Sequence, residues 1–343
     1  MATTCPRCAR PLKKRDRTGH FAICCPYELE PDAWAGGDRQ TVATLLRAKY
    51  DGAEWTALDA LLGLERSRIE NADAVARRAG WPRERALGLL HTAMRSLPLP
   101  ADASVPIRVI HRDAHVLVVD KPPGYEVSPA KRLARGSMVN GAVAHVGHDV
   151  YPAHRLDRDT SGCLCFALDK ASARRLGASF QRNLVHKEYL AVVSGDVLAS
   201  QDRRDFTVTA RICEVDGDTS VRSTVQSDGC RSQEALTTMR VLGTSAGSSY
   251  SLLLAKPTTG RTHQIRVHCA SIGHPLVADA PYKGAEHAEM PRQALHALRL
   301  RLPHPDGDAE LKAYAPPPDD LRKLCAAVGI DLDAALKEAG LAG

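Results

Sequence analysis

The spacing of apolar and polar positions changes character near residue 100. Before it, apolar residues recur every three or four positions, which predicts α-helices over residues 41–47, 55–62, 73–78 and 83–95. Trp81 and Pro82 precede the last of these as a helix start signal. The sequence therefore predicts a helical region over residues 38–97. A Pro/Gly-containing linker at 31–37 separates this region from residues 1–30.

After residue 105 the pattern becomes a mixture of β-rich runs and helical segments. Residues 137–146 and 171–180 have the pattern of helices, and strands are predicted at residues 107–110, 115–120, 163–168 and 185–193. Gly and Ser turns in the polar stretch 196–250 predict hairpins. We expect one domain of strands and helices over residues 105–320, followed by a peripheral Ala-rich helix and tail at 321–343.

Composition sets broad limits on the function. Of the 343 residues 44% are hydrophobic, and the apolar runs are far shorter than the ~20 residues that a membrane-spanning helix needs. A net charge of +6 weakly favours a polyanion such as RNA, whereas 4% aromatic residues argue against an extended stacking platform for single strands. Ten cysteines without a signal peptide predict an intracellular protein, cytoplasmic or nuclear, with mitochondrial import as the alternative.

Paired cysteines near the N-terminus suggest a metal site. Cys5 and Cys8 form one pair, and His20 and Cys24 lie four positions apart, which places both on one face of a helix. Thiolates and imidazoles at this spacing predict a tetrahedral Zn²⁺ ion. The segment resembles a C2HC zinc finger, an element that binds RNA, DNA or protein. Two alternatives stay open, namely Cys25 as the fourth ligand and a reduced, basic tail without metal.

One polar stretch, at residues 154–162, stands directly before an apolar run. It reads His-Arg-Leu-Asp-Arg-Asp-Thr-Ser-Gly. A polar loop that leads into a buried strand holds its side chains on a rigid frame, which is a common way to build an active site. Two interpretations of its carboxylates are possible. Asp157 and Asp159 could pair with the neighbouring arginines as a surface cluster, or Asp157 could be catalytic.

A second stretch, at residues 258–268, is dense in hydrogen-bonding side chains. It reads Thr-Thr-Gly-Arg-Thr-His-Gln-Ile-Arg-Val-His. If the stretch is extended, Gln264 and Arg266 lie on one side and His263 on the other, whereas a helix would group them differently. So many polar groups predict a wall that faces a ligand. We interpret His263 and His268 as scaffold.

Together the two stretches resemble the motifs HRLD-x2-TSG and TGRTHQIRVH of the RluA-type RNA pseudouridine synthases. VVDKPPGYEVSP at residues 118–129 is similar to the family's opening strand and loop, and Lys-Glu-Tyr at 187–189 to its second motif. The resemblance implies an α+β pseudouridine synthase fold, with a bent, mainly antiparallel mixed sheet, flanking helices and a central RNA-binding cleft. It also implies isomerisation of uridine to pseudouridine in RNA without a cofactor.

The resemblance assigns roles to single residues. Asp157 corresponds to the catalytic aspartate and Arg266 to the cation that keeps it ionised. Asp157 could attack C1′ or C6 of the uridine or take a proton from C2′, and the sequence leaves this open. Tyr189 would stack on the uracil and could help to remove the C5 proton. Arg155 would fill the space that a flipped base leaves, and further RNA contacts are expected from Lys187, Arg261 and Gln264.

Three other functions fit parts of the sequence. A catalytically inactive RNA-binding or ribosome-assembly factor would keep the fold, but intact Asp157, Tyr189 and Arg266 argue against it. A zinc-finger adaptor is compatible with catalysis. Glycoside hydrolysis by Asp157 and Asp159 needs carboxylates on both sides of the scissile bond, whereas residues two apart on an extended chain share one face. We expect a monomer that acts on structured RNA, either rRNA or tRNA.

One position departs from the family pattern. Residue 278 is alanine, whereas the family usually has glycine there. We expect a small local difference and no loss of chemistry.

Overall fold

The computed structural model describes residues 3–4, 11–12, 38–62, 72–129, 134–215, 218–224 and 232–341. Two short strands near the N-terminus, β1 (Thr3–Thr4) and β2 (Pro11–Leu12), pair with each other. The predicted zinc ligands lie outside the described residues; these are Cys5, Cys8, His20 and Cys24. Within the described residues, no group of three or more His, Cys, Asp or Glu side chains is placed to hold a metal ion.

The chain divides into two compact units. The first comprises Met1–Ala101 and Pro129–Arg135, and the second comprises Asp102–Ser128 and Gly136–Gly343. In its described part the first unit contains α2 (Asp38–Arg47), α3 (Gly52–Leu62), α4 (Ala72–Ala79) and α5 (Arg83–Ser96). Their apolar faces form one core around Leu46, Leu58 and Met94, which are fully buried. The four helices predicted from apolar spacing are thereby confirmed.

The second unit is built on a mixed sheet of eleven strands in the described residues. In chain order these are β3 (Arg108–Arg112), β4 (Val116–Lys121), β5 (Tyr151–Pro152), β6 (Ser161–Ala167), β7 (His186–Ser194), β8 (Asp205–Val215), β9 (Asp218–Ser223), β10 (Gln233–Thr244), β11 (Tyr250–Pro257), β12 (Leu295–Pro303) and β13 (Glu310–Tyr314). The strand order is β3-β4-β6-β12-β7-β11-β10-β8-β9, with β5 beside β6 and β13 beside β12. Among these pairings only β6 with β12 is parallel, so the sheet is mainly antiparallel.

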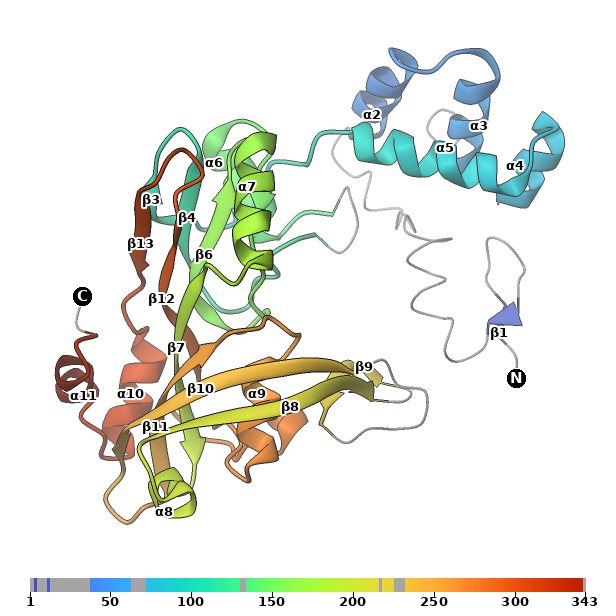
Figure 1. Ribbon diagram of the computed structural model, residues 1–343. Coiled ribbons are helices and arrows are strands. Elements are labelled where there is room, and N and C mark those ends of the chain that lie inside the picture. Colours follow the sequence, from blue (N-terminus) through green and yellow to red (C-terminus); the bar gives the residue numbers. More distant parts are fainter. Residues whose placement is uncertain are drawn as a thin grey trace. The chain divides into compact units, whose positions relative to one another are not determined.

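Strand β7 connects the two halves of the sheet because it pairs with β12 on one side and β11 on the other. Figure 1 shows that β8, β10 and β11 run steeply across the direction of β4, β6 and β12. Side chains alternate along β7, so that Lys187 and Tyr189 face one side of the sheet, and Glu188 and Leu190 face the other. Side chains on the two faces of β7 therefore contact different parts of the second unit.

Helices cover both faces of the sheet. The described helices are α6 (Met138–Val146), α7 (Lys170–Gln181), α8 (Val197–Gln201), α9 (Gln264–Ser271), the 3₁₀ turn η2 (Ala280–Tyr282), α10 (Asp319–Ala327) and α11 (Leu332–Glu338). Leu176 of α7 packs with Leu300 on the face of Lys187. Leu321 and Leu336 of the C-terminal helices pack with Leu190 on the opposite face. In both units, no described helix is long and apolar enough to cross a membrane.

The C-terminal segment corrects one expectation. In place of a single peripheral helix, two short helices follow Pro318, and their leucines are fully or almost fully buried. Asp331 caps α11 by accepting a hydrogen bond from the N–H of Ala334 at 2.9 Å, which starts a new helix after the turn at Gly329. This segment is part of the core of the second unit.

Two buried contacts hold the loop before β6. The Lys121 ammonium is fully buried and donates hydrogen bonds to the carbonyl oxygens of Pro122, Tyr125 and Arg158 at 3.0, 2.8 and 2.7 Å. Gly162 has φ of +110°, and an added Cβ would lie 2.2 Å from the carbonyl oxygen of Ala297 in β12. Only glycine permits this backbone at such a close approach. The loop at residues 154–160 is thus held at Arg158 and at the point where the chain enters β6.

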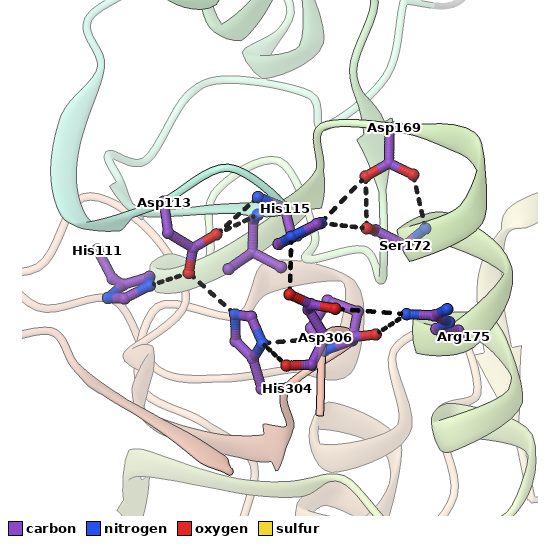
Figure 2. Close-up of polar contacts among 10 residues, drawn as sticks. His111, Asp113, His115, Asp169, Ser172, Arg175, His304 and Asp306 are labelled. Carbon is purple, nitrogen blue, oxygen red and sulfur yellow. Dashed lines mark hydrogen bonds and ion pairs between the residues drawn. The ribbon is translucent and has the colours of Figure 1, made fainter. Parts of the chain in front are cut away.

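A cluster of histidines and aspartates joins the β3–β4 turn to the turn after β12 (Figure 2). The Oδ1 atom of Asp113 accepts the backbone N–H groups of His115 and Val116 at 2.7 and 2.9 Å. Its Oδ2 atom lies 2.7 Å from Nε2 of His111 and 2.9 Å from Nε2 of His304. Burial raises the pKa of Asp113, but these four hydrogen bonds outweigh it and hold the pKa below its ordinary value.

Replacing Asp113 should make the protein less stable and its stability less sensitive to acid. Because the folded pKa lies below the unfolded one, the stabilisation is complete above the unfolded pKa of about 3.9 and is lost as pH falls toward the folded pKa. We expect Asp113→Asn to lower the free energy of unfolding by about 2 kcal/mol at pH 7 and by less near pH 3. Urea unfolding at both pH values measures this. Asp308→Asn, on the exposed turn after β12, is the control, and equal losses at the two pH values would contradict the expectation.

Candidate active site

A cavity of about 440 Å³ opens on the face of β7 that carries Lys187 and Tyr189. Its walls come from the loop at residues 153–157, from β7, from the loop after β11 and from the start of α9. Every catalytic or RNA-binding residue predicted from the sequence in this unit lines it, namely Asp157, Tyr189, Arg266, Arg155, Lys187, Arg261 and Gln264. Segments about a hundred residues apart in the sequence thus meet in one cavity of a size typical of small-molecule sites.

At the centre of the cavity one guanidinium lies between two carboxylates. The Arg266 Nη1 atom donates to Oδ2 of Asp157 at 3.3 Å, while its Nε and Nη2 atoms donate to the two oxygens of Asp279 at 2.8 and 2.7 Å. The Asp279 side chain is fully buried, whereas that of Asp157 is 19% exposed. Two parallel hydrogen bonds to Asp279 fix the plane of the guanidinium. Arg266 therefore presents its remaining N–H edge to the carboxylate that faces the cavity.

His263 also lies beside Asp157. Its Nε2 atom is 3.9 Å from Oδ2 of Asp157, and its Nδ1 atom is 2.9 Å from the Tyr282 hydroxyl. That hydroxyl already accepts the N–H of Arg222 at 2.9 Å, so its own proton is available for Nδ1. If the hydroxyl donates to Nδ1, the ring proton lies on Nε2 and faces Asp157. Burial lowers the pKa of His263, although the nearby Asp157 opposes the shift.

Two side chains of β7 form the floor of the cavity. Tyr189 is almost fully buried, and burial together with the charge of Asp157 raises its pKa well above the ordinary value, so the phenol stays neutral. Lys187 donates from Nζ to the carbonyl oxygen of Thr259 at 3.2 Å. Burial lowers the pKa of Lys187 to about 8. The site therefore combines a neutral aromatic ring with a cation that has no carboxylate partner in the described residues.

Gln264 differs from the expectation of an RNA contact. Its Nε2 atom donates to the carbonyl oxygen of Leu236 and to the Thr237 hydroxyl at 3.0 and 2.9 Å, and its Oε1 atom accepts from the Thr259 hydroxyl and the N–H of Arg261 at 2.7 and 3.0 Å. The amide is thus occupied at both ends by the protein. Gln264 therefore holds the loop at residues 258–261 in place through these hydrogen bonds.

Of the two alternatives for residues 262–268, the structure has the helix. His263 adopts φ of +55° at the N-cap, and α9 begins at Gln264. His268 is fully buried, with Nδ1 2.9 Å from the Thr237 hydroxyl, in agreement with a scaffold role. His263 is not only scaffold, because it faces Asp157.

The alanine at position 278 has a structural consequence. Ala278 adopts φ of +58°, in the left-handed region that favours glycine. This accounts for the glycine that the family usually has there. The Asp279 carboxylate next to it binds Arg266.

For three polar residues of this site no role in catalysis or binding was predicted from the sequence. These are Asp279, Tyr282 and the cavity-facing His263. Asp279 carried one signal, because it is a carboxylate at the end of the apolar run Leu276-Val277-Ala278. A charged group in such a place is buried only when it has a partner. The partner itself lies on α9 and could not be chosen from spacing alone.

Comparison with known proteins agrees with the geometry. Residues 115–271 match the family model described as RNA pseudouridylate synthase. The chain is 35% identical over 225 residues to an uncharacterized RNA pseudouridine synthase of Bacillus subtilis (strain 168), covering 64% of this chain and 76% of that one. It is 30% identical over 331 residues to ribosomal large subunit pseudouridine synthase D of Nitrosomonas europaea, covering 88% of this chain and 93% of the relative.

A solved structure of human RNA pseudouridylate synthase domain containing 1 matches with a TM-score of 0.50 and 27% identity, covering 67% of this chain and 97% of that one. The mixed, mainly antiparallel sheet of the second unit is therefore the α+β pseudouridine synthase fold that the two motifs predicted. The chain belongs to the RluA family of RNA pseudouridine synthases, and it is a pseudouridine synthase, an intramolecular isomerase.

Proposed function

We propose that this enzyme converts uridine to pseudouridine in structured RNA, with Asp157 as the catalytic carboxylate. The observation that carries the proposal is the position of Asp157, which faces the cavity with Arg266 at 3.3 Å and His263 at 3.9 Å. An opposite charge at this distance stabilises the ionised carboxylate. The fixed guanidinium needs no reorganisation during the reaction.

The reaction rearranges the nucleoside without changing its composition. The N1–C1′ bond breaks, the uracil turns, C5 bonds to C1′, the C5 proton leaves and N1 takes up a proton. Asp157 begins this sequence either as a nucleophile at C1′ or C6 or as a base at C2′, and all three routes need an ionised carboxylate beside the sugar. No cofactor takes part in any of them.

We assign the remaining cavity residues to binding and orientation. Tyr189 packs against the uracil ring, and its neutral phenol favours this role over proton removal. The Arg155 side chain is exposed and makes no hydrogen bond to the described residues, so it is available to fill the space of a flipped base. Lys187 and Arg261 provide charge for phosphate or uracil oxygens, and Gln264 positions their loop.

Of the candidate RNAs we favour ribosomal RNA over transfer RNA. The similarity to the ribosomal large subunit synthase covers 88% of this chain. The second unit alone is shorter than this, so the similarity extends into the N-terminal helices. The zinc site at Cys5, Cys8, His20 and Cys24 stays a prediction from the sequence. Metal analysis of the purified full chain tests it, and a preparation without zinc would contradict it.

The function is tested by mapping pseudouridine in cellular RNA with and without this protein. We expect at least one position in rRNA to lose pseudouridine when the gene is deleted and to regain it when the wild-type gene is restored. The Asp157→Ala gene serves as the matched control and should not restore it. A deletion that changes tRNA positions would redirect the assignment to tRNA, and unchanged rRNA and tRNA would contradict the proposal.

A further inference from the structure

A second groove lies on the opposite face of β7 from the active site. It has a volume of about 360 Å³ and is lined by Glu188, Leu254, residues 339–341 after α11 and five cations, which are Arg240, Lys256, Arg299, Arg301 and Lys312. Because Glu188 and Tyr189 are neighbours on one strand, their side chains point to opposite faces. The groove is therefore separated from the catalytic cavity by the sheet itself.

The cations are placed by strand register across neighbouring strands. Arg299 lies opposite Glu188 of β7, and Arg301 lies opposite both His186 of β7 and Lys312 of β13. Lys256 of β11 reaches Oε1 of Glu188 at 2.8 Å. Adjacent strands are about 4.8 Å apart, so the positive charges form a row about 15 Å or more in length.

The carboxylates nearby do not balance this row. Glu188 pairs with Lys256, Asp205 accepts from Arg240 at 2.7 Å, and Glu310 lies 3.4 Å from Lys312. Arg301 is exposed and has no partner in the described part of the chain. Like charges directly opposite on paired strands destabilise a sheet. Glu310 offsets the charge of Lys312, whereas no described carboxylate offsets that of Arg301, so an anion bound at Arg301 would stabilise this pair of strands.

We propose that this groove binds the phosphate backbone of the RNA, at a segment away from the nucleotide in the catalytic cavity. A row of cations with few base-reading groups suits phosphates, which lie about 6 Å apart along one RNA strand, better than a single small anion. The groove adds affinity for large, structured RNA without touching the target uridine. This inference rests on the proposed function only in taking RNA as the ligand.

Direct binding tests the groove without requiring catalysis. The probe is a fluorescent 20-base-pair RNA duplex made only of G and C, which offers no uridine to the catalytic cavity. We expect Arg301→Glu with Lys312→Glu to weaken binding about tenfold at low salt and to reduce the slope of log affinity against log salt by about two. The neutral pair Arg301→Gln with Lys312→Gln should give a smaller loss. Unfolding curves verify that each variant folds.

The matched control places the same charge change on α7, as Lys170→Glu with Arg174→Glu. Both residues are exposed on a helix that packs against the other face of the sheet. A much smaller loss in this control supports the groove, whereas equal losses in the two pairs, or no loss in the groove pair, would overturn it. Pseudouridine mapping is scored separately. An unchanged affinity of the groove variants would therefore not contradict the proposed reaction, and a negative mapping result would not contradict RNA binding in the groove.

Discussion

Replacing Asp157 with alanine is expected to abolish pseudouridine formation while RNA binding persists. The carboxylate faces the cavity beside Arg266, and all three candidate routes start from it. Loss of the group that begins bond cleavage should lower kcat by on the order of 10⁴-fold or more. Pseudouridine yield in rRNA transcripts, measured at saturating RNA, separates this loss of chemistry from a loss of affinity.

The same loop provides a matched control in Asp159. Its carboxylate does not line the cavity, and its backbone oxygen, which a change to alanine retains, accepts a hydrogen bond from Arg292 at 2.8 Å. We expect this variant to retain most of the activity. Asp157→Ala should also change the free energy of unfolding by less than about 1 kcal/mol, because Arg266 keeps its buried partner Asp279. Turnover by Asp157→Ala above about one hundredth of the wild-type rate would exclude a catalytic role.

The residues that line the catalytic cavity could be predicted from the sequence, whereas the buried residues that hold them in place could not. Asp157, Tyr189 and Arg266 were found because they lie in short motifs whose order along the chain resembles a known family. Asp279, which binds Arg266, and Tyr282, which contacts His263, lie in the segment around Ala278, where no site residue was predicted, and only folding brings that segment to α9. Contacts between distant segments leave no periodic trace in a sequence.

The stretch at residues 262–268 shows why pattern alone left two structures open. Residues 264–269 of α9 are all buried, so no polar face marks the helical period. Gln264 looked like an RNA ligand because its amide is polar, yet it is 4% exposed and all its hydrogen bonds are internal. By contrast, α7 was predicted within a residue because only one of its faces is buried.

Asp279→Ala is expected to reduce both stability and activity, and this separates its role from that of Asp157. The Arg266 side chain is 7% exposed, and Asp279 accepts two of the three hydrogen bonds that its guanidinium donates to described residues. Removing one partner of a buried ion pair costs about 3–5 kcal/mol, since the remaining charge stays desolvated. Without the fixed guanidinium plane, Asp157 also loses its oriented partner, and kcat should fall by about 10²-fold. Urea unfolding and single-turnover kinetics measure the two effects.

Two further variants make this prediction specific to the buried pair. Asp333→Ala removes a carboxylate that accepts two hydrogen bonds from Arg322 at 2.9 and 3.1 Å on the exposed surface, and should cost less than about 1 kcal/mol. Arg266→Met with Asp279→Leu replaces both buried charges by apolar groups, and should recover stability but not activity. If Asp279→Ala unfolds at the wild-type urea concentration, then Asp279 does not hold Arg266. If the double variant recovers activity, then the guanidinium is dispensable and Asp157 acts without an oriented cation.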